Sequence, residues 1–206
     1  MCIRDRYGAA GTSSSGSGRN RARSSSSIVV NPAPPTMCAA SRTAATGRSG
    51  STTTNGMPDL PVVAVLEAAH MVGGAGFTTM EADDLARFRP LPELDVPAAP
   101  YLLLDVDTGP DTLNVPPSEA LPRITAAGRS PLTVAEGLSV LAAEPGVLRT
   151  RSCFSLLGSR AGDKRVPALW VSARRPRLGW CYQGAPHTWL GSASCAGRLA
   201  EPARIG

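Results

Sequence analysis

The sequence predicts an α+β fold. The strongest strand signal is the unbroken apolar run at residues 101–106, of the kind that central strands show. Two segments with helical features follow, at residues 118–127 and 134–144, and three short apolar segments come after them. Because short loops join these segments, they are most simply antiparallel, and we expect a three-stranded antiparallel meander. Helices that are followed by such a meander are typical of the α+β class.

The N-terminal part of the chain is predicted to be a disordered leader. The first six residues look like the translation of a sequencing adapter, and serine runs and single arginines follow them. The apolar triplet at 28–30 can bury too little apolar surface to offset the entropy that the backbone loses on folding, roughly 1 to 2 kcal/mol per residue. We therefore expect residues 1–56 to be an artefactual or untranslated leader, and residues 57–206 to form a single α+β domain.

The first part of the domain is predicted to contain three strands and one helix. Residues 61–66 are largely β-branched and bounded by proline, which favours a buried strand over a helix. Residues 77–80 form a second strand candidate, and residues 81–88 have helical spacing with acidic residues in the first turn. The run at 101–106 is the predicted central strand, and a turn with the sequence Asp-Thr-Gly-Pro ends it.

The second part of the domain is predicted to contain two helices and the meander. The helix at 118–127 stops at Gly128, since glycine commonly ends helices. The helix at 134–144 begins with a capping box, in which the side chains of Thr133 and Glu136 each accept a hydrogen bond from the other residue's backbone N–H. Residues 188–197 form either a last helix or a turn of small residues at the sheet edge. The meander strands are predicted at residues 152–157, 166–172 and 178–182.

The net charge of +5 is concentrated in the leader, which contains seven arginines and one acidic residue. Residues 57–122 hold eleven acidic and two basic residues, whereas residues 123–206 hold twelve basic and four acidic ones. Because opposite charges on neighbouring surfaces attract, we expect these two halves to neutralise each other when they pack. A basic groove that binds nucleic acid is a less favoured explanation of the arginines than this neutralisation, and we expect no nucleic-acid partner.

Targeting signals are missing from the sequence. No apolar stretch reaches the roughly 18 residues of a membrane-spanning helix. No apolar core of the length found in secretory signals follows the early charges. We therefore expect a cytoplasmic protein without a membrane segment, and its oligomeric state is not predicted.

The cysteines argue against a metal site. Their odd number and the lack of a Cys-x-x-Cys pair favour reduced thiols. Cys153, Cys181, Cys195 and His187 are the residue types of a zinc site, but structural zinc usually takes two ligands from one short knuckle. Five residues separate Cys181 from His187, and seven separate His187 from Cys195. We expect no metal and no other cofactor.

Nucleophilic catalysis is one hypothesis for some of these residues. A nearby imidazole can activate a thiol, so Cys181 or Cys195 with His187 would suit a hydrolase or a transferase. In that case Asp105 or Asp107 would orient the imidazole. The alternative for the cysteines is that they are small buried residues without a catalytic role. The two aspartates also have the spacing of the haloacid-dehalogenase phosphatases, but that chemistry needs a lysine, and the single lysine of this chain lies in a predicted loop. Their other interpretation is a turn in which the carboxylates bind local N–H groups. Whether the protein is an enzyme stays open.

Aromatic residues gather near the C-terminus, where Trp170, Trp180, Tyr182, His187 and Trp189 lie within twenty residues. One interpretation is a core of stacked rings under the meander, because an exposed indole costs free energy. The other is a cleft for a planar or anionic ligand. Trp180 and Tyr182 alternate along a predicted strand, so they share one face of it.

The cleft hypothesis makes the protein a module that binds a small polar or anionic ligand. Trp180 and Trp189 would be the walls, Arg160 and Arg198 the anion partners, and His187 a polar contact. The alternatives are the Cys/His hydrolase or transferase and a structural or partner-binding domain without a small-molecule site.

The motifs after residue 127 resemble those of a bacterial family that is known only as a domain of unknown function. The resemblance covers about residues 77–198, and it implies no catalytic or binding residue, because none is established for the family. Tyr182 and Ala185 stand where the family pattern has Trp and Asn. The family's proteins are also longer in ordered sequence ahead of Pro61, which suggests that this chain is an N-terminally damaged copy. Ahead of residue 127, residues 105–109 and 121–122 also match the family pattern. The segments that match after residue 127 are 128–133, 136–137, 158–160 and 167–172 and, most specific of all, Gly179-Trp180-Cys181, His187-Thr188-Trp189-Leu190-Gly191 and Ala196-Gly197-Arg198.

Overall fold

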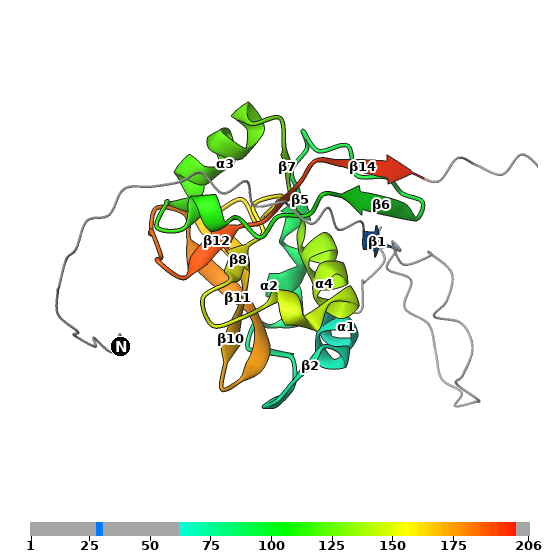
Figure 1. Ribbon diagram of the computed structural model, residues 1–206, viewed down its shortest axis with the longest axis vertical. Helices are drawn as coiled ribbons and strands as arrows, with labels where there is room; N and C mark the ends of the chain where they lie inside the picture. The colour runs from blue at the N-terminus through cyan, green and yellow to red at the C-terminus, as the bar shows by residue number, and fades with distance from the viewer. Residues whose placement is uncertain (1–27, 31–61, 201–206) are drawn as a thin grey trace, which may run out of the picture.

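The computed structural model describes residues 28–30 and 62–200, and it confirms the α+β class. Figure 1 shows helices packed around one large sheet, with the long β10–β11 hairpin at the bottom of the view. The large sheet has five strands in the order β12 (Leu190–Ser192), β8 (Cys153–Ser155), β10 (Arg165–Ser172), β11 (Arg175–Tyr182) and β4 (Phe77–Thr78).

The predicted meander forms the centre of this sheet. Strands β8, β10 and β11 are antiparallel neighbours, as the short loops predict. Ala173 and Arg174, which join β10 to β11, have φ angles of 51° and 59°. Positive φ at both central residues is the conformation of the type I′ hairpin turn. The outer strands β12 and β4 are parallel to their neighbours, so the sheet is mixed.

The strand predicted at 61–66 is wrong, because these residues begin α1 (Val62–Ala68). Leu66 is fully buried, Val62 and Val65 pack against the core, and Val63 is 47% exposed. Buried positions three and four residues apart are the pattern of a helix with one apolar face. A short apolar run does not by itself separate helix from strand, and here packing against α4 (Val134–Ala143) decides the outcome.

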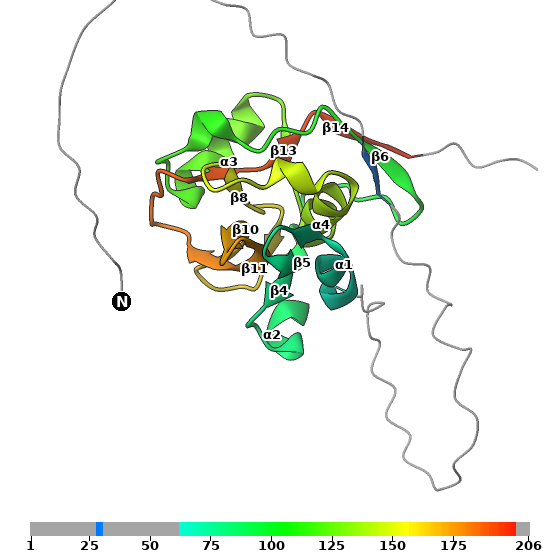
Figure 2. The ribbon, with the colours of Figure 1, turned by 60° about the horizontal axis from the view of Figure 1, so that its bottom comes forward.

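The strand predicted at 77–80 and the helix predicted at 81–88 are confirmed in shorter form, as β4 and α2 (Ala82–Ala86). Figure 2 shows β4 and α2 beside the β10–β11 hairpin, and α1 beside α4. Two small antiparallel pairs complete this region, namely β2 (His70–Met71) with β3 (Gly74–Ala75), and β5 (Arg89–Pro90) with β9 (Ser159–Arg160).

The predicted central strand, β6 (Tyr101–Leu104), is the middle strand of a second sheet rather than of the large one. Its antiparallel neighbours are β14 (Gly197–Ala200) and β1 (Ile28–Val30). Strand β1 is the apolar triplet of the predicted leader, so this part of the leader has structure. The other residues of 1–56 lie outside the described part of the chain.

Both helices predicted in the second half are confirmed, as α3 (Pro117–Ala126) and α4. The capping box is confirmed too, because the Glu136 N–H donates to Thr133 Oγ1 at 3.3 Å and the Thr133 N–H donates to Glu136 Oε2 at 2.8 Å. Single 3-10 turns follow β6 and α4, at η1 (Pro110–Thr112) and η2 (Pro145–Val147). Among the described residues, no helix has the length and apolar character needed to cross a membrane.

The helix considered for residues 188–197 is wrong. These residues form β12 and β13 (Ser194–Cys195), which pairs with β7 (Ser130–Pro131). The alternative, a turn of small residues at the sheet edge, has the right place, since β12 is an edge strand of the large sheet, but residues 190–192 and 194–195 are strands rather than a turn.

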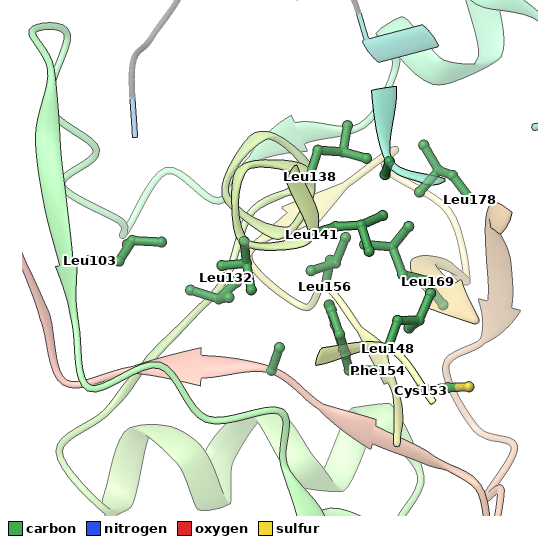
Figure 3. Close-up of a cluster of buried hydrophobic side chains, with 14 of the residues drawn as sticks. Leu103, Leu132, Leu138, Leu141, Leu148, Cys153, Phe154, Leu156, Leu169 and Leu178 are labelled. Carbon is green, nitrogen blue, oxygen red and sulfur yellow. The ribbon is translucent and has the colours of Figure 1, made fainter. Parts of the chain in front are cut away.

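The main core lies between α4 and the large sheet. Leu138 and Leu141 of α4 are at most 1% exposed, and they lie among Leu156, Leu169 and Leu178 in Figure 3. A second, smaller cluster sits under α3, around Ile124 and Val166. Helices therefore pack against both faces of the β10–β11 pair. A site can form at the parts of this pair that the helices leave uncovered.

A candidate ligand pocket at the edge of β11

A pocket of about 470 Å³ opens where β4 leaves the edge of β11. Strand β4 pairs with β11 at only two positions, Phe77 with Arg177 and Thr78 with Leu178, and the chain then turns into α2. The pocket fills the angle between these elements. Its lining residues are Thr79, Met80, Glu81, Asp84, Trp170, Arg177, Gly179 and Trp180.

The floor of the pocket depends on Gly179. A Cβ atom on this residue would lie 2.3 Å from Cη2 of Trp170, so the indole ring occupies the space that any side chain here would need. Trp170 pairs in register with Arg177, two residues before Gly179 along β11. The ring therefore lies diagonally across two strands, and glycine is the residue that permits it.

Arg177 lies over the rings of Trp170 and Phe77, with its Cζ atom 5.2 Å and 5.6 Å from the two ring centroids. Its Nη2 donates to Thr79 Oγ1 at 2.9 Å. Its Nε–H is buried and has no hydrogen-bond partner among the described residues. Most buried donors are hydrogen-bonded, so Arg177 is a residue whose polar contacts the described part of the fold leaves incomplete.

Trp180 lines the pocket from the other face of β11, because neighbouring residues of a strand point to opposite faces, and it is 46% exposed. Arg165 lies near its ring, at 5.7 Å from the centroid, and donates to both carboxylate oxygens of Asp84 at 2.6 and 2.7 Å. This hydrogen bonding lowers the pKa of Asp84, so the carboxylate stays ionised and paired at neutral pH. Glu81 differs from Asp84, because its carboxylate makes no hydrogen bond or ion pair with any described residue.

The predicted cleft is not assembled as a unit. Trp180 lines the pocket, but His187 and Trp189 do not. These two rings contact each other, with centroids 5.3 Å apart, in the loop that leads to β12 at the far edge of the sheet. Burial lowers the pKa of His187, which favours the neutral imidazole. The predicted core of stacked rings is also wrong, since Trp180, Tyr182 and Trp189 are 46%, 47% and 37% exposed.

Of the two predicted anion partners, Arg198 is held inside the fold. Its side chain is 6% exposed, and its Nε and Nη2 donate to the two carboxylate oxygens of Glu136 at 2.6 and 2.9 Å. Tyr101 Oη donates to the same carboxylate at 2.8 Å. Arg160 donates from Nη2 to Gln183 Oε1, and neither arginine lines the pocket.

The two candidate nucleophiles are poorly placed to form thiolates. Cys195 is fully buried, and burial raises its pKa. Burial also raises the pKa of Cys181, to about 11, so both thiols are protonated at neutral pH. No hydrogen bond joins His187 to either thiol in the part of the chain that the structure describes. The role of these residues in catalysis stays a hypothesis that the geometry does not favour.

The two aspartates have structural contacts. Asp105 Oδ2 accepts from Arg129 Nη1 at 2.7 Å, and Asp107 Oδ1 accepts from the Gly109 N–H at 2.7 Å. The contact of Asp107 is the one expected from the alternative interpretation, a turn in which a carboxylate binds a local N–H group. The Arg129–Asp105 pair and the Arg165–Asp84 pair each join the acidic half of the domain to the basic half, as the charge distribution predicts.

Sequence reasoning found Trp180 but missed Trp170, Arg177 and Glu81 as pocket residues. The available signal was Gly179 within a strand, since an isolated strand glycine often marks a close approach by another group. Glu81 carries no such signal, because it reads as an ordinary acidic residue at the start of a helix.

Comparison with known proteins gives one match. No curated protein and no solved structure matches the chain. A protein family that is described as a family of unknown function matches residues 31–201. This range includes the segment that resembles such a family, and it extends into the predicted leader. The chain therefore belongs to the family of unknown function DUF5701.

Proposed function

We propose that this protein binds a small polar molecule in the pocket at the edge of β11, which Trp170 and Trp180 line from opposite faces of the sheet. The observation that carries the proposal is the exposed side chain of Trp180 at the rim of a pocket that Trp170 also lines. Exposed aromatic surface of this kind is stabilised when a ligand covers it. A volume of about 470 Å³ is within the range of small-molecule sites.

Arg177 supports a polar ligand rather than a purely apolar one. Its guanidinium is held between two rings, so its position is set before a ligand arrives. The guanidinium forms no ion pair with a described residue, so its charge is available to a carboxylate, carbonyl or phosphate oxygen of a ligand. Apolar walls with a few fixed polar groups are the usual composition of a small-molecule site.

The proposal is tested by titrating the protein with a panel of amino acids, carboxylates, nucleobases and nucleosides, with calorimetry as the measurement. We expect at least one compound to bind, and Trp180→Ala to weaken that binding about tenfold or more, equivalent to about 1.4 kcal/mol. Trp189→Ala is the matched control, because Trp189 is also exposed but lies outside the pocket. Binding that survives Trp180→Ala, or a panel without a single binder, would overturn the proposal.

A further inference from the structure

Part of the backbone at the pocket lacks a strand partner. Strand β4 stops pairing after Leu178, but β11 continues to Tyr182. Beyond β11 at residues 179–182 there is no further strand among the described residues. The pocket opens along this edge, and it is lined there by Gly179 and Trp180.

The register shows which backbone groups face the open edge. The Gln183 N–H donates to the Lys164 carbonyl at 2.9 Å, and Trp180 pairs with Pro167 three steps further along the same register. Hydrogen-bonded and non-hydrogen-bonded pairs alternate in an antiparallel ladder, so Trp180 occupies a non-hydrogen-bonded position. Its N–H and C=O therefore point away from β10, toward the edge that β4 has left.

The side chains of the pocket supply two opposite charges that no described residue of opposite sign neutralises. Arg177 supplies a cation that forms no ion pair with a described residue, and Glu81 supplies a carboxylate without a partner among the described residues. Asp84 is different, because Arg165 already neutralises it. A purely anionic ligand would meet the repulsion of Glu81, and a purely cationic one would meet that of Arg177.

We propose that the ligand is a free α-amino acid, bound as a zwitterion; this inference rests on the proposed function. Its carboxylate faces Arg177 and the backbone N–H of Trp180, and its ammonium group faces Glu81 and the backbone C=O of Trp180. Its side chain packs against the exposed indole of Trp180. Each charged end thus meets one side chain of opposite sign and one backbone group, which is the arrangement that satisfies the donors and acceptors of both partners.

The first test compares matched forms of one ligand. The standard L-amino acids are titrated at millimolar concentration, and the best binder is then compared with its N-acetyl derivative, which lacks the positive charge, and its amide, which lacks the negative charge. We expect the zwitterion to bind about tenfold or more tightly than either derivative. Equal binding of a derivative, or no binding of any amino acid, would overturn the inference.

The second test uses Glu81→Gln, which removes the carboxylate charge and keeps the size of the side chain. We expect this variant to weaken the zwitterion about tenfold and to leave the N-acetyl derivative unweakened. Glu119→Gln is the matched control, since Glu119 is an exposed carboxylate on α3 outside the pocket. Thermal unfolding of each variant checks that it is folded. An unchanged zwitterion affinity in folded Glu81→Gln contradicts the inference.

The two proposals fail in distinguishable ways. If no amino acid binds but another compound of the panel binds in a way that depends on Trp180, the zwitterion is wrong and the binding function stands. If no compound of the whole panel binds, both are wrong.

Discussion

At the scale of single residues, the absence of a side chain at Gly179 is what shapes the pocket. The Trp170 ring occupies the position where a Cβ atom would lie, at 2.3 Å, and the ring in turn supports Arg177. One glycine therefore positions both an apolar wall and the cation of the site. The neighbouring cysteine at 181 is better understood as a small buried residue than as a nucleophile, because burial keeps its thiol protonated at neutral pH.

We expect Gly179→Ala to destabilise the protein by about 1 to 3 kcal/mol, because the added methyl group forces the indole out of its position. The same change weakens ligand binding, since it moves the floor of the pocket. Urea unfolding and calorimetry measure the two effects. Gly197→Ala in β14 is the control, because no atom lies within 4 Å of the added Cβ there. A Gly179→Ala protein as stable as Gly197→Ala would contradict this account of the pocket floor.

At the scale of elements, the buried pair of Glu136 and Arg198 joins α4 to the second sheet. Glu136 is the third residue of α4 and is fully buried, and Arg198 lies on β14. Tyr101 of β6 and the Thr133 N–H also donate to the Glu136 carboxylate. One carboxylate thus accepts hydrogen bonds from the helix cap and from two strands, so the cap predicted from the sequence also joins α4 to the second sheet.

We expect Arg198→Met to destabilise the protein by about 3 to 5 kcal/mol, because it leaves the Glu136 charge buried without its partner. Adding Glu136→Gln to this variant restores part of the loss, because the unpaired charge is then gone. Urea unfolding of both single variants and the double variant measures this coupling. Additive effects of the two substitutions would mean that the pair does not act as a unit.

The elements that could be predicted are those with a strong local signal. The capping box marked the start of α4, and short loops marked the antiparallel meander. Residues 61–66 had a pattern that fits helix or strand, and contact with α4 selected the helix. Strand β12 is parallel to β8 and distant from it in sequence, so no local pattern predicts this pairing.

At the scale of the whole molecule, ion pairs connect the acidic and basic halves of the domain. Arg165 from β10 holds Asp84 of α2, and it also pairs with Asp163. Hydrogen bonding to Arg165 lowers the pKa of both carboxylates below the ordinary value of 3.8. A carboxylate with a lowered pKa stabilises the fold above its unfolded pKa, and this contribution is lost as the pH falls through the folded pKa.

We therefore expect the urea midpoint to fall when the pH is lowered below about 4, and Arg165→Gln to make this fall smaller. The measurement is urea unfolding at pH 7, 4 and 3. Arg123→Gln is the control, because its exposed pair with Glu119 lies within α3 and joins no other element. The same acid dependence in the Arg165→Gln protein as in the parent would show that the ion pairs of Arg165 do not stabilise the fold.

The sequence by itself determined the fold class, the two longer helices, the meander and the opposite charges of the two halves. Each of these follows from residues that are close in the chain or from composition, which act before any tertiary contact forms. Only the tertiary structure decided the pocket, because its charges come from Glu81 and Arg177, which are nearly a hundred residues apart. It also separated Trp189 and Arg198 from Trp180, since the large sheet places β12 and β11 apart and buries Arg198 against Glu136. Which side chains share a site depends on strand order and packing, and neither is encoded in the spacing of residues along the chain.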